Sequence, residues 1–398
     1  MIFVALLVLA IWLDLWLARA GFWRIDREPV PCPPALWTAI TAVIPARNEE
    51  RVLGTTLRSL WSQDYPGDLR IVVVDDHSED RTAEVARVVA REVATDRGRP
   101  ADLCVLQAPP LPPGWSGKVW AMQHGVECGL TPDDPARYIL FSDADIEHGP
   151  GALRELVCRA EAGPCDLVSF MVRLQCCSRA ERMMIPAFVF FFKMLYPFRR
   201  INEAADPLAG AAGGTMLVRR EALKRIGGLG CIGHELIDDC ALGREIKRGG
   251  HRIWLGLSAT SGSTRGYNSL PEICQMIART AYTQLAYSPA RLLMCIAGLV
   301  LTFVAPPLLL LFASGWSAIG GGGAWLLMSL LYMPMVRFYG RPPLQAFLLP
   351  LTALLYLWAT VLSAWQYHRG RGGQWKGRAQ TPVGRRIEPE YGGSDEIG

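Results

Sequence analysis

The fold of this chain is decided by Ala-Val-Ile-Pro-Ala-Arg-Asn-Glu-Glu (residues 42–50) and Val-Val-Val-Asp-Asp-His-Ser-Glu-Asp-Arg-Thr (residues 72–82). Each stretch begins with a β-branched apolar run and then turns polar, which is typical of a buried strand that ends in a loop. A helix is expected near residues 50–61, and another after the second loop, where Ser78 and Thr82 occupy capping positions. This alternation predicts an α/β domain with a mostly parallel sheet and right-handed crossovers.

Acidic side chains follow the predicted strands. Glu49 comes after the first strand, Asp75 and Asp76 after the second, and the apolar run at 138–141 leads into Ser-Asp-Ala-Asp at 142–145. Open α/β sheets bind ligands outside the carboxyl ends of their strands, where a carboxylate can accept hydrogen bonds from a base or a ribose. Any one of these acids could be a helix cap, but the series at successive strand ends favours a ligand site.

The pair Asp143 and Asp145 is a candidate metal site. On an extended strand the two side chains would point to opposite faces, but a turn would let one bind a metal while the other orients a sugar. A hard cation such as Mg²⁺ or Mn²⁺, bridging a diphosphate, prefers oxygen ligands of this kind. The sequence contains neither a GxGxxG nor a Walker motif, which disfavours dinucleotide and P-loop folds.

A further acidic pair, Asp238 and Asp239, opens a predicted helix over residues 237–249. Negative charge in a first helical turn is favoured by the macrodipole, which explains the pair without any function. Alternatively, Asp239 is a general base that takes a proton from an acceptor hydroxyl. The glycines Gly213 and Gly214 would let backbone approach a ligand closely, or form a tight turn.

Composition excludes some classes of protein. The net charge of +4 is too small to indicate a nucleic-acid partner, whereas 51% hydrophobic residues and a mean hydropathy of +0.18 are high for a purely soluble chain. The eleven cysteines include no CxxC pair, and we expect them to be reduced thiols. Cys231, His234 and Cys240 lack the fourth ligand and the spacing of a zinc site.

Apolar stretches at the two ends of the chain predict membrane segments. Residues 1–18 are just long enough to span a bilayer, and Arg19 and Arg24 after them indicate that the chain from residue 20 onward is cytoplasmic. The rival interpretation is a signal peptide with a cleavage site at Ala18-Arg19-Ala20. An apolar core that contains Trp12 and Asp14, and a start without Lys or Arg, favour an uncleaved anchor.

Residues 292–366 are expected to hold the C-terminal membrane segments, at 292–314, about 324–336 and 344–365. The middle one is short and follows a glycine run at 320–323. Three full crossings would put the basic tail, residues 367–398, outside, against the positive-inside rule, so either one stretch is re-entrant or the tail is an exception. We predict this tail to be disordered.

Two further segments are candidates for the membrane surface. Residues 183–198 are apolar but too short and too interrupted for a span, so they form either a buried core helix or an interfacial helix that helps a lipid reach the site. Residues 268–290 are predicted to be an interfacial helix.

With these motifs in this order, residues 38–260 resemble the catalytic domain of family 2 glycosyltransferases, which have the GT-A fold. The resemblance implies a nucleotide-diphosphate sugar donor, a divalent metal, and inversion by a single in-line displacement. It also implicates three groups of residues. Pro45, Glu49, Asp75, Asp76, Lys118 and Asp143 would bind the nucleotide sugar, Asp145 with Asp143 would hold the metal, and Asp239 with Asp238 would be catalytic.

Two departures from the family pattern narrow the function. Asp238 stands where glutamate is usual, which shortens the reach of that side chain. The QxxRW motif of processive synthases is missing from the stretch at 275–282, which argues against a polysaccharide product. More narrowly, segments at 185–192, 236–242 and 278–285 resemble bacterial hopanoid-biosynthesis-associated glycosyltransferases, which implies a lipid acceptor and the bacterial inner membrane.

Three alternatives stay open at the level of sequence. The acceptor could be a polyprenyl phosphate rather than a lipid hydroxyl. The chain could be a nucleotidyltransferase, which would release diphosphate instead of a nucleoside diphosphate. It could also be a catalytically inactive membrane scaffold. The sugar, the nucleotide and the oligomeric state are not readable from the sequence.

Overall fold

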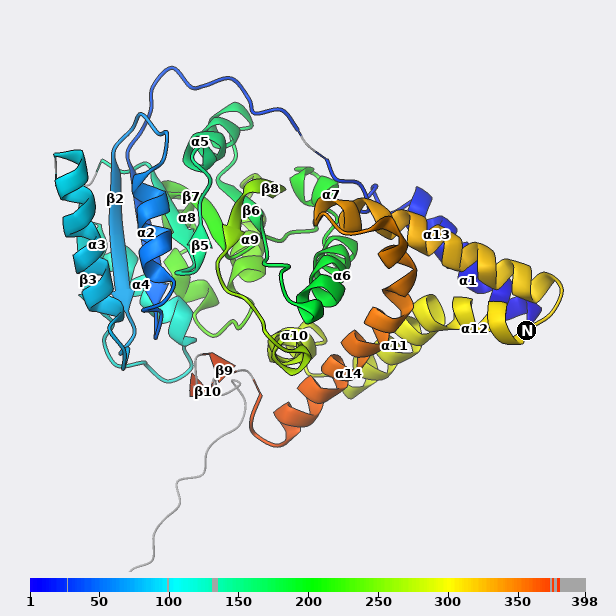
Figure 1. Ribbon diagram of the computed structural model, residues 1–398. Helices are drawn as coiled ribbons and strands as arrows, with labels where there is room; N and C mark the ends of the chain where they lie inside the picture. Colours follow the sequence, from blue (N-terminus) through cyan, green and yellow to red (C-terminus); the bar gives the residue numbers. More distant parts are fainter. Residues whose placement is uncertain (27, 99, 131–134, 373, 376–377, 380–398) are drawn as a thin grey trace, which may run out of the picture.

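The structure is a computed structural model that describes residues 1–398 except 27, 99, 131–134, 373, 376–377 and 380–398. An α/β domain lies on one side, and long apolar helices from both ends of the chain lie together on the other (Figure 1). The segment after helix α1 (Ile2–Leu17) runs across the α/β domain to reach its first strand.

Within the described residues, eight strands form the central sheet in the order β3-β2-β1-β4-β7-β6-β8-β5. The strands are β1 (Ile40–Ala46), β2 (Leu69–Asp75), β3 (Leu103–Gln107), β4 (Tyr138–Ser142), β5 (Ile146–Glu147), β6 (Leu167–Arg173), β7 (Thr215–Arg219) and β8 (Ile253–Ser263). Strands β1 to β4 are mutually parallel, as predicted, and β7 then runs antiparallel to β4 and β6. The fold-class prediction is confirmed, with a sheet that is mixed rather than almost wholly parallel.

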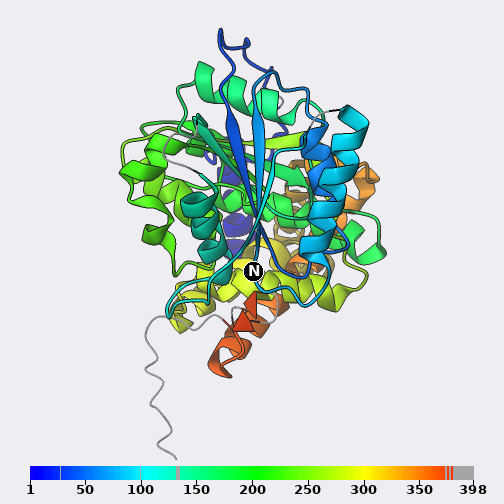
Figure 2. The same cartoon turned by 90° about the vertical axis from the view of Figure 1, so that its left-hand side faces the viewer.

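Helices cover both faces of this sheet, as the edge-on view shows (Figure 2). The helices of the domain are α2 (Leu53–Trp61), α3 (Thr82–Arg97), α4 (Gly117–Gly129), α5 (Ala152–Ala162), α6 (Arg179–Leu195), α7 (Phe198–Asn202), α8 (Arg220–Arg225) and α9 (Asp238–Arg248). Alternate residues of a strand face opposite sides, so Ile44 belongs to the apolar cluster that includes residues of α2, α3 and α5, whereas its neighbour Val43 belongs to the cluster that includes residues of α4, α6 and α9.

The pairing register of the strands brings the strand ends that carry the predicted site residues to one edge of the sheet. Strands β1, β2 and β4 end there, and β7 begins there, since Ser142 pairs with Thr215. Strand β8 also ends there, because it runs parallel to β6, and β5 pairs with its last residues. Loops that are far apart in the sequence therefore meet along a single edge.

The capping prediction for α3 is wrong. The hydroxyls of Ser78 and Thr82 accept instead from the backbone N–H groups of Asn48 and Glu49, in the loop after β1. Asp80 serves the helix start, since its carboxylate accepts from the N–H of Thr82 at 2.9 Å. The hydroxyls tie the two strand-end loops together, a tertiary role that local sequence does not reveal.

The C-terminal part of the chain forms long apolar helices. They are α10 (Leu270–Gln284), α11 (Pro289–Leu299), a π-helical turn η2 (Val300–Val304), α12 (Ala305–Phe312), α13 (Trp316–Phe338) and α14 (Leu349–His368). Of the described residues, three helical stretches are long and apolar enough to cross a membrane: Pro289–Phe312, Trp316–Phe338 and Pro343–His368. Helix α1, at 16 residues, is shorter.

The middle stretch is longer than the sequence suggested, because the glycine run at 320–323 is helical. A Cβ on Gly321 would lie 2.4 Å from the Cβ of Leu309 and 2.8 Å from the carbonyl oxygen of Pro306. The glycines therefore let α12 and α13 approach closely, as small residues do between membrane helices.

Helix α6 resolves the alternatives for residues 183–198 in favour of a buried helix. Met184, Ile185, Val189 and Phe190 are fully buried, and the helix packs against α10, α13 and α14. One apolar core runs from the sheet through α6 into the long helices. In the predicted tail, Gln374–Trp375 pairs with Arg378–Ala379, and residues 380–398 lie outside the described residues.

Trp12 joins α1 to the long helices. Pro306 and Pro307 have no N–H, so the carbonyl of Thr302 has neither an α-helical nor a π-helical donor. The indole N–H of Trp12 donates to this carbonyl at 2.8 Å, and its ring packs edge-on against Phe303 at 5.4 Å. In a membrane an unpaired carbonyl is costly, so this bond holds α1 in the bundle.

We expect Trp12→Phe to lower the free energy of unfolding by about 1–3 kcal/mol, because it leaves a buried carbonyl unpaired. Thermal unfolding in detergent measures the effect. The matched control is Trp16→Phe, the same change one turn further along the same helix, where the side chain is 43% exposed. Equal melting temperatures for the two variants would contradict the role given to Trp12.

Candidate active site

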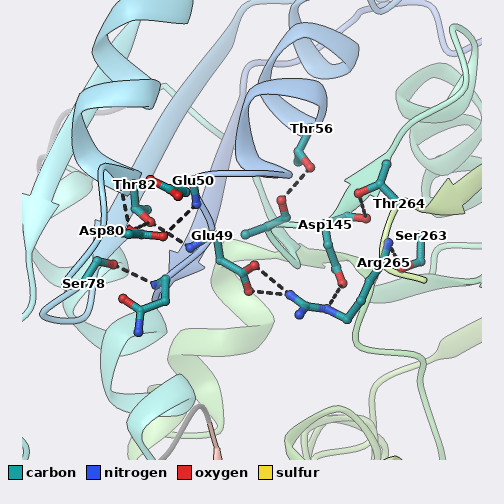
Figure 3. A network of polar contacts seen from close by, with 12 residues as sticks. Glu49, Glu50, Thr56, Ser78, Asp80, Thr82, Asp145, Ser263, Thr264 and Arg265 are labelled. Carbon is teal, nitrogen blue, oxygen red and sulfur yellow. Dashed lines mark hydrogen bonds and ion pairs between the residues drawn. The ribbon is translucent and has the colours of Figure 1, made fainter. Parts of the chain in front are cut away.

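The turn that carries Asp143 and Asp145 is clamped from two sides. From α2, the buried hydroxyl of Thr56 donates to the carbonyl of Ala144 at 2.8 Å. From the end of β8, the N–H and the hydroxyl of Thr264 donate to the carbonyl of Asp145 at 2.7 and 3.0 Å (Figure 3). The turn is therefore fixed through its carbonyl groups, which leaves both carboxylates for other partners.

A buried histidine contacts the strand end that leads into the same turn. His148 Nε2 lies 2.9 Å from the hydroxyl of Ser142, the last residue of β4. Burial lowers the pKa of His148 to about 4, so the ring is neutral at pH 7. A neutral ring adds no positive charge next to the acidic turn.

Arg265, two residues beyond β8, joins two of the predicted site acids. Its Nη2 lies 2.7 Å from both oxygens of Glu49, and its Nε lies 2.7 Å from Oδ2 of Asp145 (Figure 3). Burial alone would lower the pKa of Arg265, but these two carboxylates raise it above its ordinary value. The short distances are those of charge-assisted hydrogen bonds.

Lys118, at the start of α4, joins two others. Its Nζ lies 2.9 Å from Oδ1 of Asp143 and 3.0 Å from Oδ2 of Asp238. Burial would lower the pKa of Lys118, yet the neighbouring carboxylates raise it, so the ammonium stays charged. A small cavity at the strand ends is lined by Pro45, Lys118 and Asp143. These three residues, which were all predicted to bind the nucleotide sugar, thus come together.

Asp239 lies beside this second group. Its Oδ2 accepts from the backbone N–H of Gly213 at 2.8 Å, and its Oδ1 accepts from the N–H of Cys240 at 2.7 Å. Burial and the charge of Asp238 raise the pKa of Asp239 to about 6, against the opposing effects of Lys118 and the two N–H donors. A carboxylate with such a pKa can take up a proton near neutral pH.

A side chain at Gly213 would crowd this contact. A Cβ at Gly213 would lie 3.2 Å from Oδ2 of Asp239 and 3.3 Å from Nζ of Lys118. The close backbone approach that the sequence suggested is therefore made to an acid and a lysine of the site.

The remaining predicted residues are Asp75, the last residue of β2, and Asp76, the first residue of the loop after it. The carboxylate of Asp75 accepts from the N–H of Ser78 at 3.2 Å, so it also serves the loop as a local cap. Asp76 is fully buried and forms an ion pair with Arg47 at 3.8 Å. Both acids lie at the edge where Glu49 lies, and β1 separates their strand from β4, which leads to Asp145.

The residues present fit a divalent cation that is shared with a diphosphate. Among the described residues, no three His, Cys, Asp or Glu side chains are grouped closely enough to hold a metal alone. Asp143 and Asp145 offer the two carboxylates, with 36% and 14% of their side chains exposed. Mg²⁺ is commonly held by one or two carboxylates, with substrate phosphates and water supplying the other ligands.

The sequence missed some residues of the site. Arg265 could have been found by assigning Ile253–Ser263 as a strand and applying the same rule about strand ends to it. Tyr196, after α6, lies close enough to Asp239 for that charge to raise the pKa of its phenol, after the larger effect of burial. Its hydroxyl donates to Gln284 of α10 at 3.1 Å. No local pattern marks Tyr196.

Comparison with known proteins agrees with this geometry. Residues 41–227 match the model of the family described as Glycosyl transferase family 2, so this part of the chain carries a domain of that family. The chain is 32% identical over 122 residues to an uncharacterised protein of Methanocaldococcus jannaschii, covering 30% of this chain and 40% of that protein. It is 35% identical over 112 residues to 4,4'-diaponeurosporenoate glycosyltransferase of Staphylococcus aureus, covering 27% and 24%. The matched region thus spans less than half of these relatives.

Among solved structures, the chain is similar to a mannosyltransferase from Pyrobaculum calidifontis in complex with GDP-Man and Mn²⁺. The TM-score is 0.53 at 17% sequence identity, and the alignment covers 92% of this chain and 98% of that one. At this identity the likeness is one of fold. The chain therefore has the GT-A fold with additional apolar helices.

We expect Thr56→Val to lower the free energy of unfolding by about 1–3 kcal/mol, because the carbonyl of Ala144 loses its buried donor. Denaturant or thermal unfolding in detergent measures the loss. Thr55→Val, on the exposed side of the same helix, is the matched control and should be nearly neutral. A Thr56→Val protein as stable as this control would show that the clamp is unimportant.

Proposed function

We propose that this chain, whose residues 41–227 carry a glycosyltransferase family 2 domain, is a membrane-bound inverting glycosyltransferase. It transfers a sugar from a nucleotide-diphosphate donor, with UDP-sugars the first to test, to the hydroxyl of a lipid. The observation that carries this proposal is Asp239. A carboxyl with a pKa near 6 lies beside the Lys118–Asp143 pair, at the edge where the strands end.

The donor lies along this edge in our proposal. Glu49, Asp75 and Asp76 contact the nucleoside, because they follow the adjacent strands β1 and β2. The sugar and the diphosphate extend toward Asp143 and Lys118, past Pro45. The positive charge of Lys118 offsets part of the negative charge that develops on the leaving diphosphate.

Asp239 acts as the base. It accepts the proton of the acceptor hydroxyl as that oxygen attacks the anomeric carbon from the side opposite the diphosphate. Gly213 N–H holds the carboxylate in place, and Asp238 shares Lys118 with Asp143. A bound Mg²⁺ or Mn²⁺, held by Asp145 and Asp143, would supply charge neutralisation of the departing nucleoside diphosphate.

A lipid acceptor is supported by the way the site adjoins the apolar helices. Tyr196 and Gln284 lie at the ends of α6 and α10, which both pack against α14, and the Tyr196 phenol interacts with Cys240, the residue after Asp239. A lipid held against these helices would present a hydroxyl from this side. A hopanoid or a related polycyclic lipid is our specific candidate, on the strength of the sequence resemblance.

The location that we propose is the bacterial inner membrane. Arg19 and Arg24, which follow α1, favour a cytoplasmic catalytic domain, where nucleotide sugars are found. The three apolar stretches beside the domain make the chain membrane-associated, and the number of crossings is part of the proposal.

Replacing the base tests the acceptor class. We expect Asp239→Asn to lower kcat by roughly 10²–10⁴-fold with little change in donor affinity, because a hydroxyl acceptor must lose its proton. In the unchanged protein, kcat/KM should rise as pH increases through about 6, where Asp239 ionises in the free enzyme, and then level off. The measurement is a pH–rate profile of lipid glycosylation in detergent.

The control for this variant is Asp64→Asn, an exposed acid at the far end of α2 that pairs with Arg154. It should keep the rate and the pH profile of the unchanged protein. A phosphate acceptor is already ionised, so a nearly unchanged kcat in Asp239→Asn would favour transfer to a polyprenyl phosphate.

The activity itself is tested with a panel of UDP- and GDP-sugars and purified protein. We expect turnover that requires Mg²⁺ or Mn²⁺ and falls about a hundredfold or more in Asp145→Ala, because the leaving group loses its neutralising charge. Chromatography of the products identifies the nucleoside diphosphate. If no donor is bound or consumed, and the variant matches the unchanged protein, the chain is a scaffold and not an enzyme.

A further inference from the structure

Arg265 lies between Glu49, which is assigned to the nucleoside, and Asp145, which is assigned to the metal. It makes two hydrogen bonds of 2.7 Å to Glu49 and one of 2.7 Å to Asp145 (Figure 3). Glu49 and Asp145 have only 10% and 14% of their side chains exposed, so neither charge is well screened by solvent. Arg265 is therefore the counter-charge that lets these two acids lie together.

The backbone that carries Arg265 is held in place by other contacts. The side chain of Gln175 donates to the carbonyl of Thr264 at 2.9 Å, and the buried carboxylate of Glu181 accepts from the N–H of Tyr267 at 2.6 Å. Ser178 Oγ donates to the carbonyl of Tyr267 at 2.7 Å. The guanidinium thus reaches its partners from a fixed segment, and its position does not depend on an unconstrained loop.

This arrangement weakens the binding of a cation at Asp145. The guanidinium already bonds to one oxygen of Asp145, and a divalent cation at the same carboxylate would lie within a few ångströms of a fixed positive charge. At such a distance, and in partly buried surroundings, the repulsion is large enough to change affinity by an order of magnitude or more. A diphosphate would offset it, because its oxygens add negative charge and further ligands.

We propose that Arg265 is a positioning residue that keeps the affinity of Asp145 for a free divalent cation low, so that the cation binds together with the nucleotide diphosphate. This inference rests on the proposed function, because it takes Asp145 as the metal ligand. Arg265 holds the acids in place before the donor arrives. It also keeps the site from binding Mg²⁺ or Mn²⁺ without a substrate.

The test is Mn²⁺ binding to the purified full-length protein in detergent, followed by the electron paramagnetic resonance of free Mn²⁺. Each protein is titrated with Mn²⁺ alone, with Mn²⁺ and UDP, and with Mn²⁺ and GDP. We expect Arg265→Gln to bind Mn²⁺ alone at least about tenfold more tightly than the unchanged protein, because the competing charge is gone. The gain in Mn²⁺ affinity on adding the nucleotide should be smaller in this variant.

Two further variants separate charge from general damage. Arg265→Lys keeps the positive charge, so its affinity for Mn²⁺ alone should stay within about threefold of the unchanged protein. Arg58→Gln removes a remote, exposed arginine that pairs with Glu92, and should change nothing. Arg265→Ala removes the same charge and provides the measurement if the glutamine variant does not fold.

Two results would overturn the inference. One is an affinity of Arg265→Gln for Mn²⁺ alone within twofold of the unchanged protein, including the case where neither binds. The other is a lysine variant that binds Mn²⁺ alone as tightly as the glutamine variant. Both results concern metal binding without a donor, so they leave the turnover of sugar nucleotides as a separate test of the proposed function.

Discussion

Mutual repulsion among carboxylates is the constraint on which the site depends. Like charges within a few ångströms disfavour one another's ionised form, unless cations or N–H donors offset them. Lys118 and Arg265 each bridge two acids here: Lys118 joins Asp143 to Asp238, and Arg265 joins Glu49 to Asp145. The acids that meet at this edge are Glu49, Asp143, Asp145, Asp238 and Asp239.

The negative charges of these acids are not all offset to the same degree, and this difference gives the site its chemistry. Asp239 makes hydrogen bonds to two backbone N–H groups but shares its nearest ammonium with Asp143 and Asp238. Burial and the charge of Asp238 raise its pKa, which suits a base that must first be ionised and then accept a proton. Asp143, in contrast, is paired directly with that ammonium and suits an electrostatic role.

The sequence located the acids at the strand ends but not the arginine that bridges two of them. The acids after β1, β2 and β4 follow apolar runs that read directly as strands, so the rule about strand ends located them. Lys118 came only from a family resemblance, and Arg265 was missed, since its partners are 216 and 120 residues away. Its place depends on β8 pairing with β5 and β6, a long-range arrangement that no local pattern encodes.

In the apolar helices, too, some features could be predicted from the local sequence and others depend on contacts between distant residues. Their hydropathy was readable from the sequence, but the glycines at 320–323 suggested a flexible break. Whether glycine breaks a helix or lets it pack depends on what lies opposite, and opposite Gly321 is the backbone of α12. Likewise, Trp12 looked like an obstacle to a signal peptide, whereas its indole completes a hydrogen bond that two prolines leave open.

Helix α6 connects the site to the apolar helices at both of its ends. At its start, Glu181 accepts hydrogen bonds from the N–H groups of Cys177, Ser178 and Tyr267, and so holds the segment that carries Arg265. Just beyond its end, Tyr196 lies near Asp239. Between the two ends the helix is buried in the core that the domain shares with α13 and α14. A shift of α6 against those helices would therefore move the segment that carries Arg265, so the packing that anchors the domain also affects the geometry of its site.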